Sequence, residues 1–435
     1  MSTLPHASAL ALRRAQIPLP RVTAETRART GSAVPRGTTR QPAAGRSPEP
    51  RAQLAAGPSW HFAKHVSATL DRSADDRVTR RHVRYAQRAV LWRESRLQRV
   101  RYCGRITHGG DGGNVVAKLR EDVAHFSGLQ SCGSIWACPV CSAKIRNGRA
   151  NEISAAAAAW DLAGNSVVMM TLTFPHDLGM RLAALLPIVA DGFRALISGR
   201  PWRRVKDQVG IVGTIRSIEV THGGNGWHPH AHVLVYVTGE ISAEGIAQLA
   251  VYARARWAKW ITKQGYRVPH DRHGVDIGLC TSAEEAGAYV SKTQDGRSTG
   301  NELARGDMKQ GRQGSRTPFE ILDDFRWTGD VEDLALWHEY EQATKGHQAI
   351  TWSKGLRGIL GVGQEQTDEE LAAEEVGGDD IAMIPAEVWA GVVKIPGLDA
   401  ALLDVAERSG RAGMDKLLAR HGLDPTLPPG VDVRK

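Results

Sequence analysis

The chain has 435 residues, which at roughly 150 residues per domain leaves room for two compact domains or one elaborated domain with tails. Hydrophobic residues make up 42% and charged residues 24% of it, a composition that excludes a coiled coil, a collagen-like chain and a wholly disordered one. The most apolar stretch, residues 155–174, is interrupted by Asp161 and Asn165, and no signal peptide opens the chain. We therefore expect a cytoplasmic protein without a membrane partner.

Residues 1–58 form a segment without sustained apolar periodicity. They hold eight of the twenty prolines and nine arginines but only two acids. This composition is typical of a disordered basic arm, to which we assign no site.

A strongly basic stretch follows the arm. Between Arg77 and Arg105 there are ten arginines and one acid, Glu94, so this stretch alone has a surplus equal to the net charge of +9 of the whole chain. Arginine forks bind phosphate oxygens bidentately, and counterion release favours binding to a polyanion. A solvated helical face would show the same charge pattern, and charge alone leaves both interpretations open. The DNA-binding candidates in this stretch are Arg80, Arg81, Arg84 and Arg88.

Four of the five cysteines come next. Cys138 and Cys141 have the C-x-x-C spacing of a zinc knuckle, and Cys103 and Cys132 bring the number of thiols to four. Four thiolates are enough for a closed, tetrahedral, structural zinc site. Because the outer spacing is irregular, a set of unliganded reduced thiols is the alternative. Cys280 is left over and is most simply a buried apolar residue.

Further bases follow the C-x-x-C pair directly and extend the list of DNA-binding candidates to Lys144, Arg146 and Arg149. They would lie beside the zinc ion and the basic stretch. We therefore expect residues 59–150 to be a basic, Cys-rich subdomain that binds zinc and DNA and is structural rather than catalytic.

The middle of the chain alternates apolar strands with helices. Strand composition covers residues 167–174, 209–220 and 231–237, and a glycine-rich turn between the last two predicts an antiparallel hairpin. Helical spacing covers residues 182–197, with a kink expected at Pro187, and residues 243–262 and 282–293. This order predicts an α+β fold with an antiparallel sheet covered by helices.

Three histidines alternate in the segment His228-Pro229-His230-Ala231-His232. Alternate side chains of a strand point to one face, so His230 and His232 would present two imidazoles side by side, as a divalent metal site requires. A chance surface patch is the alternative, but adjacent imidazoles repel each other when protonated. Glu219 on the preceding strand could supply a carboxylate ligand across the hairpin, or could be an exposed carboxylate. Such donors suit Mg²⁺, Mn²⁺ or a transition metal, and the sequence does not distinguish these ions.

A helix is predicted to begin at Thr281 or at the serine after it, because an acid stands three residues later. If Thr281 pairs with Glu284, then Glu285 is free and shares a helical face with Tyr289 and Lys292. On these residues alone, an ordinary half-buried tyrosine with a solvent-facing glutamate is the alternative.

The end of the chain changes composition twice. Between Glu365 and Asp380 there are eight acids and no base, which predicts an acidic linker over residues 363–385. Residues 386–435 have the pattern of a small helical accessory tail. The remaining domain is then residues 151–362.

The histidine strand followed by a helix with tyrosine and lysine resembles the HUH endonucleases. Three segments are similar to the motifs of rolling-circle plasmid replication initiators with a single catalytic tyrosine, and a fourth is similar to a segment near the end of those proteins. In chain order the four are Thr171-Leu172-Thr173, Gly226-Trp227-His228-Pro229-His230-Ala231-His232, Glu285-Ala286-Gly287-Ala288-Tyr289-Val290-Ser291-Lys292 and Thr351-Trp352-Ser353-Lys354-Gly355-Leu356-Arg357. The resemblance covers about residues 100–360 and neither tail.

This resemblance implies that residues 151–362 are an HUH nickase domain, with an RRM-like five-stranded antiparallel sheet, a central histidine strand and the tyrosine helix beside it. His230 and His232 would hold a catalytic Mg²⁺ or Mn²⁺. Tyr289 would attack the scissile phosphate, giving a 5′-phosphotyrosine and a 3′-OH primer. Glu285 would activate water to end the round, and Lys292 would stabilise negative charge.

The resemblance also implies partners, namely single-stranded or supercoiled origin DNA and the host helicase and polymerase. An HUH transposase or relaxase shares the same residues, although relaxases usually place the tyrosine before the histidines and these transposases are much shorter. A noncatalytic, zinc-stabilised DNA-binding regulator would explain the bases and cysteines but not the histidine strand.

Overall fold

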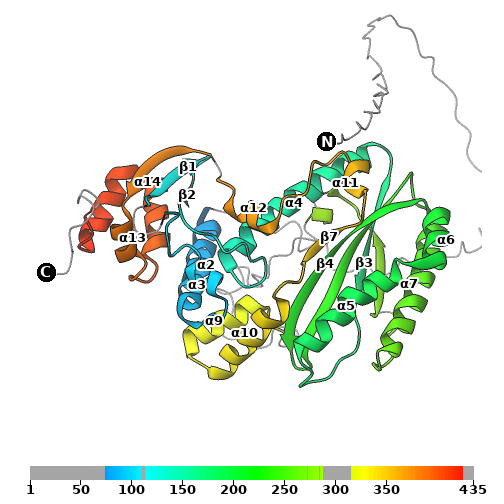
Figure 1. The fold of residues 1–435 in the computed structure, drawn as a ribbon. Coiled ribbons are helices and arrows are strands. Elements are labelled where there is room, and N and C mark those ends of the chain that lie inside the picture. Colours follow the sequence, from blue (N-terminus) through cyan, green and yellow to red (C-terminus); the bar gives the residue numbers. More distant parts are fainter. Residues whose placement is uncertain are drawn as a thin grey trace, which may run out of the picture. The chain divides into compact units, whose positions relative to one another are not determined.

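The computed structural model describes residues 74–109, 113–271, 273–283, 285–287, 315–375 and 377–424 (Figure 1). The predictions for the basic arm, Glu284, Tyr289 and Lys292 fall outside these residues. So does most of the helix predicted over residues 282–293, of which 283 and 285–287 are helical.

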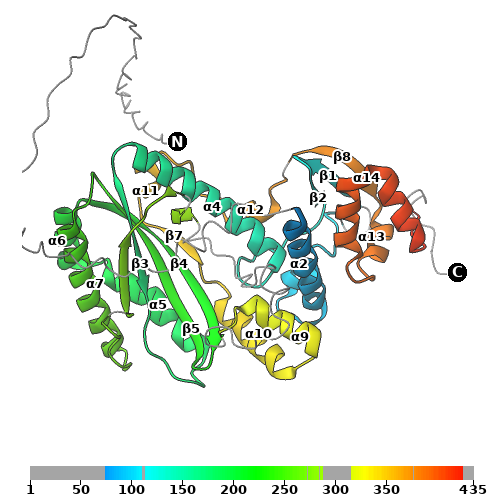
Figure 2. The same cartoon turned by 180° about the vertical axis from the view of Figure 1, so that it is seen from behind.

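In the described part of the chain, the larger of two sheets has five antiparallel strands in the order β6-β3-β5-β4-β7. The strands are β3 (Ser166–Leu172), β4 (Ile211–Gly223), β5 (Gly226–Val237), β6 (Val275–Leu279) and β7 (Ile350–Trp352). The histidine strand is β5, and it lies in the middle of the sheet (Figures 1 and 2). The structure thus confirms the α+β class, the antiparallel five-stranded sheet and the central place of the histidine strand.

The β4–β5 hairpin closes where Gly223 pairs with Gly226. Gly226 has a φ of +81°, a left-handed conformation that glycine adopts without strain. β5 begins five residues before the apolar run that predicts it. At this end of β5 only one face is buried, with Trp227, Pro229 and Ala231 inside, so alternate positions accept polar side chains.

Helices α5 (Leu182–Leu196), α6 (Gly199–Val209) and α7 (Ala243–Lys263) pack together beside this sheet (Figure 1). Tryptophans of α7 fix the contact: Trp257 Nε1 donates to Thr173 O at 2.6 Å, and Trp260 Nε1 donates to Ile188 O at 3.0 Å. Gly192 of α5 allows this approach, because a Cβ there would lie 2.5 Å from the Trp257 ring.

Among the described residues, no single helix has the length and apolar character needed to cross a membrane. Only α5 and α6 taken together pass that test of length and composition, and they are bent by 65°.

A second sheet joins distant parts of the chain. Its order is β2-β1-β8, with β1 (Val115–Arg120), β2 (Val123–Ser127) and β8 (Asp379–Ile384). Helices α13 (Ala386–Val392) and α14 (Leu398–Arg420) complete its core, where Phe126 meets Trp389 edge to face at 4.8 Å between ring centroids. β8 lies in the segment expected to be a linker. That expectation is wrong here, because β8 pairs along β1 and Lys118 Nζ meets Asp380 at 2.8 Å.

The basic helix α2 (Ala74–Glu94) turns part of its arginine-rich surface toward α14. Arg81 pairs with Asp404 at 2.6 Å and with Glu407, while Arg88 pairs with Asp399 at 2.8 Å. Arg81 and Arg88 are only 8% and 3% exposed. The structure therefore corrects the expectation that these two arginines contact DNA, because their guanidinium groups are already bound to buried acids. Arg80 and Arg84 are partly exposed.

The second group of basic DNA-binding candidates lies on α4 (Pro139–Leu162) and is also engaged within the chain. Arg149 is 5% exposed and pairs with Glu365 at 3.4 Å and Asp368 at 3.3 Å, beside α12 (Asp368–Ala373). Lys144 Nζ donates to Ala372 O at 3.0 Å, and Arg146 is 2% exposed. The supposed acidic linker thus neutralises residues that the sequence assigned to DNA.

The domain boundary expected at residue 150 falls inside α4, and the Cys-rich region shares its core with later helices. α3 (Gln98–Tyr102) follows α2, and α9 (Pro318–Thr328) and α10 (Val331–Thr344) pack beside this region. Ser95 Oγ donates to the buried Glu341 at 2.7 Å, and Trp136 Nε1 donates to His347 O at 2.7 Å.

The segment Thr351–Arg357 ties the edge of the large sheet to α4. β7 pairs with β4, and Ser353 Oγ accepts the Thr214 N–H at 2.8 Å. In α11 (Leu356–Ile359), Leu356 is buried and Arg357 Nη1 donates to Glu152 of α4 at 3.0 Å. The segment that resembles the family near its end therefore has a structural role, because it connects β4 to α4.

Arg88→Ala should lower the free energy of unfolding by about 3–5 kcal/mol, because it leaves Asp399 buried and unpaired. Urea denaturation followed by circular dichroism measures this, with the exposed Arg77→Ala as a control expected within about 0.5 kcal/mol of the parent. The double variant Arg88→Met/Asp399→Leu should recover most of the loss. An Arg88→Ala protein as stable as the control would contradict the buried pair.

Candidate functional site

Three side chains converge on the β4–β5 hairpin, a few residues from its turn. Glu219 of β4 lies directly opposite His230 of β5 in the register. Glu219 Oε2 is 3.2 Å from His230 Nε2 and 3.0 Å from His232 Nε2. The antiparallel pairing thus brings together the carboxylate and both imidazoles that the sequence singled out.

These distances fit a divalent ion. Ligand atoms about 2.1 Å from a six-coordinate ion lie about 3.0 Å apart in neighbouring positions, close to the two separations observed. The three donor atoms all lie within 4.8 Å of one another, and the side chains are 7–16% exposed. One carboxylate and two imidazoles would leave further coordination positions for water or substrate, which is typical of catalytic rather than structural sites.

The acidic member of the cluster is Glu219. Burial acts to raise the pKa of its carboxyl, but the hydrogen bonds and electrostatic interaction with His230 and His232 outweigh burial and hold the pKa well below its usual range. Glu219 is therefore ionised at neutral pH. Its carboxylate provides a fixed negative charge between the two imidazoles.

Two supporting contacts lie beside the cluster. Thr171 of β3 pairs with His232 in the sheet, and its Oγ1 is 3.3 Å from His232 Nδ1, the nitrogen that faces away from Glu219. A partner at the second nitrogen fixes the orientation of a ligating imidazole. This role gives a physical reason for threonine in the Thr171-Leu172-Thr173 segment.

The sequence offered no signal for His176, which follows β3. Its Nε2 lies 2.7 Å from Nδ1 of His228, and its Nδ1 lies 3.0 Å from Asn225 O. Burial, followed by the charges of His230 and His176, lowers the pKa of His228 to about 3, so this imidazole is neutral at pH 7. Only the fold brings these two histidines together, because they are 52 residues apart.

The start of the tyrosine motif shows the second of the two caps that the sequence allows, the one at Ser282. Ser282 Oγ accepts the Glu285 N–H at 3.0 Å, while the Glu285 carboxylate accepts both the N–H and the O–H of Thr281 at 2.7 Å. Glu285 therefore closes the first turn in this structure, and Glu284 lies outside the described residues. The catalytic candidates Tyr289 and Lys292 lie outside the described residues.

This first turn is held closely against α4. Ala286 is fully buried, and a Cβ on Gly287 would lie 1.9 Å from Ser154 Oγ and 2.9 Å from Ala150 O. Only glycine fits at that separation. The glycine of the motif thus sets how near the helix can lie to α4.

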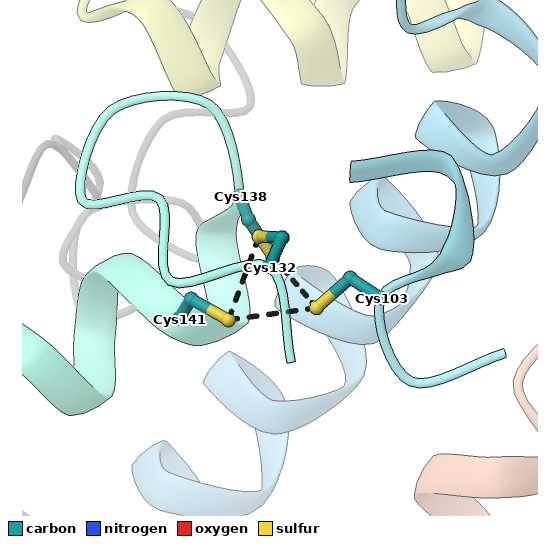
Figure 3. A group of neighbouring side chains, drawn as sticks. All are labelled: Cys103, Cys132, Cys138 and Cys141. Carbon is teal, nitrogen blue, oxygen red and sulfur yellow. Dashed lines mark hydrogen bonds between the residues drawn. The ribbon is translucent and has the colours of Figure 1, made fainter. Parts of the chain in front are cut away.

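The cysteines form a second, separate cluster (Figure 3). Cys103 follows α3, Cys132 lies in the loop after β2, and Cys138 and Cys141 stand at the N-terminus of α4. Cys103 Sγ is 3.6 Å from Cys138 Sγ and 3.5 Å from Cys141 Sγ, and Cys132 Sγ is 3.7 Å from Cys141 Sγ. All four are buried, whereas Cys280 lies outside the cluster and is partly buried.

The four thiols fit zinc. Sulfur ligands 2.3 Å from a tetrahedral zinc ion lie about 3.8 Å apart, close to the observed separations. Hydrogen bonds from the other three thiols hold the pKa of Cys141 well below its usual range. Hydrogen bonds with the neighbouring thiols instead raise the pKa of Cys132 and Cys138, so one thiolate at Cys141 is favoured over several in the same cluster. Four sulfur ligands leave no open position, so this site is structural in kind.

The fold and the histidine cluster together define the class: an antiparallel five-stranded sheet with paired histidines and a carboxylate on its central hairpin is the arrangement expected of HUH proteins. A protein named "Protein rep" from Streptomyces lividans is 35% identical over 331 residues, which cover 61% of this chain and 73% of that protein. The chain therefore belongs to the Rep protein family of plasmids.

A "Neomycin resistance protein" from Streptomyces cyanogenus is 33% identical over 159 residues, 31% of this chain and 36% of that protein. No family model matches the chain, and no solved structure matches it significantly.

Cys138→Ser should remove the stoichiometric zinc and lower the melting temperature, because a structural metal contributes its binding free energy to folding. Inductively coupled plasma mass spectrometry and a thermal melt measure the two effects. Cys280→Ser is the matched control and should keep its zinc. A Cys138→Ser protein with normal zinc content and melting temperature would exclude the structural site.

Proposed function

We propose that this chain is a replication initiator that nicks one strand of plasmid origin DNA and begins rolling-circle synthesis. Membership of the Rep family supports the replication role. The observation that carries the nicking step is the convergence of Glu219, His230 and His232 on the central hairpin. That cluster has no evident use in a protein that only binds DNA.

Glu219, His230 and His232 would hold a divalent cation, with Mg²⁺ or Mn²⁺ as the candidates. When bound, such an ion withdraws charge from the scissile phosphate and orients it. The residues around the cluster keep it in shape: Thr171 holds the His232 ring, and the hairpin register holds Glu219 against His230.

Tyr289 is the proposed nucleophile. Its phenolic oxygen forms a bond to the phosphorus of the scissile phosphate while the bond from phosphorus to the 3′ oxygen breaks. The 3′ oxygen takes up a proton and leaves as the 3′-OH primer, and the 5′ side stays attached as a phosphotyrosine. Lys292 would stabilise the negative charge that develops in this step.

Glu285 is proposed to act at the end of the round, when it accepts a proton from a water molecule. The water oxygen bonds to the phosphorus of the regenerated origin while the bond from that phosphorus to the 3′ oxygen breaks, and the 3′ oxygen takes up a proton and leaves as a 3′-OH. The Glu285 carboxylate also accepts two hydrogen bonds from Thr281. One residue would thus serve both as helix cap and as base, and a test must separate these roles.

The proposed partners follow from this reaction. Origin DNA, single-stranded or supercoiled, is the substrate, and the 3′-OH is extended by a host polymerase behind a host helicase. Zinc at the four cysteines would stabilise the region that packs on α4 and is not assigned a catalytic role.

Tyr289→Phe should abolish nicking and the covalent adduct while DNA binding stays nearly unchanged, because only the nucleophilic oxygen is lost. The assay is a denaturing gel of a labelled single-stranded origin oligonucleotide incubated with protein and Mn²⁺. His230→Ala/His232→Ala should also lose cleavage, and the exposed His108→Ala should not.

An adduct that persists in Tyr289→Phe would refute the assignment of the nucleophile. A parent protein that binds the oligonucleotide but forms no adduct with any divalent cation would favour the noncatalytic regulator. A transposase or relaxase would give an adduct but would not support synthesis of unit-length circles from the nicked origin.

Glu285→Gln separates the two roles of that residue, since an amide oxygen can still accept the Thr281 hydrogen bonds but is not a base. Nicking should continue, whereas release of unit-length circles should slow by about 10²–10⁴-fold. Glu285→Ala removes the cap as well and should lower stability by about 1 kcal/mol. If Glu285→Gln leaves nicking and circle release both at the parent level, the residue serves only as a cap.

A further inference from the structure

A groove that the proposed nicking chemistry does not use is lined by residues of α2, α3, the end of α9 and α13. Its volume is about 1060 Å³, at the upper end of the roughly 300–1,000 Å³ typical of a ligand pocket. The volume alone does not select the ligand, and the chemistry of the lining does.

Among the residues that the structure describes, the acidic and basic side chains that line this groove have one sign. They are Arg93, Arg105, Arg326 and Lys394, and none of the described lining residues is an aspartate or glutamate. Arg93, Arg105 and Lys394 are exposed and form no ion pair within the part of the chain that the structure describes. Arg81 and Arg88 of α2, by contrast, form ion pairs with the buried acids Asp404 and Asp399.

Aromatic side chains line the same groove as these cations. Trp327 is 72% exposed and Tyr102 is 38% exposed, although large aromatic side chains are usually buried. The Arg326 guanidinium lies 4.1 Å from the centre of the Trp327 ring, and Arg326 Nε is bound to Asp323 at 2.8 Å, so the ring is supported from one side. The buried Trp92 and Trp389 also line the groove.

We propose that this groove holds single-stranded DNA, with bases stacked on Trp327 and Tyr102 and phosphates bound by Arg93, Arg105 and Lys394. Unpaired bases expose the flat faces that such rings bind, whereas a duplex hides them. An acidic peptide would meet the cations but would leave the exposed rings without a matching surface. The proposal rests on the DNA-binding part of the proposed function and is independent of Tyr289 and of the histidine cluster.

The test measures binding of the full chain to a fluorescein-labelled dT oligonucleotide of about 15 nucleotides by anisotropy, in EDTA so that cleavage plays no part. Trp327→Ala should weaken binding about 5-fold or more, since a stacked base contributes at least about 1 kcal/mol, and Trp327→Phe should retain most of the affinity. Arg93→Ala/Arg105→Ala/Lys394→Ala should lower the slope of log affinity against log salt by about 2, that is about 0.7 for each lost phosphate contact.

The matched control removes three exposed bases of α7, as Arg254→Ala/Lys259→Ala/Lys263→Ala, and should change the affinity much less. Equal losses in the two triple variants would overturn the proposal, because binding would then depend on net charge alone. The proposal would also be overturned if Trp327→Ala weakened binding of a duplex of the same length as much as it weakens binding of dT. Binding of a polyglutamate peptide to the groove in the absence of dT binding would overturn it as well. If the groove variants still nick a short oligonucleotide, the proposed nicking function does not depend on the groove.

Discussion

The packing along a single helix, α4, is the constraint on which the rest of the structure depends. Its N-terminus carries Cys138 and Cys141, and its other end passes directly into β3 of the large sheet. Between these ends it binds Arg357 through Glu152 and receives Gly287 against Ser154. A continuous helix is stiff, so the cysteine cluster, the edge of the sheet and the first turn of the tyrosine motif are fixed relative to one another.

Two helices, α2 and α4, explain how a basic protein can fold without exposing all of its positive charge. Bases on α2 and α4 have acidic partners more than 200 residues later in the chain, in α14 and around α12. A buried guanidinium is stable only when it is paired with an acid. These ion pairs therefore hold segments that are distant in the sequence together, as the pairing of β1 with β8 also does. The cations left for an external polyanion are then a smaller set than the composition suggests.

Local patterns in the sequence predicted much of the candidate site. The alternation of His230 and His232 and the glycine turn fixed a hairpin whose register brings Glu219 opposite His230, and C-x-x-C spacing located half of the cysteine cluster. Pairings between distant segments have no such signal. The acidic composition of residues 365–380 predicts a linker, and only the fold shows that β8 in this segment pairs with β1. Likewise, only the path of the loop after β3 brings His176 to His228. The capping of the tyrosine motif was ambiguous because two adjacent glutamates satisfy the same spacing.

The pairing between α2 and α14 also concerns the time during which the protein is made. Asp404 is 323 residues after Arg81, so at about 5–20 residues per second the ribosome adds it roughly 16–65 s later. During that interval the acids that pair with Arg81 and Arg88 in the finished protein have not yet been added. Synthesis of α14 therefore changes the surface charge of α2, and it does so only once per molecule.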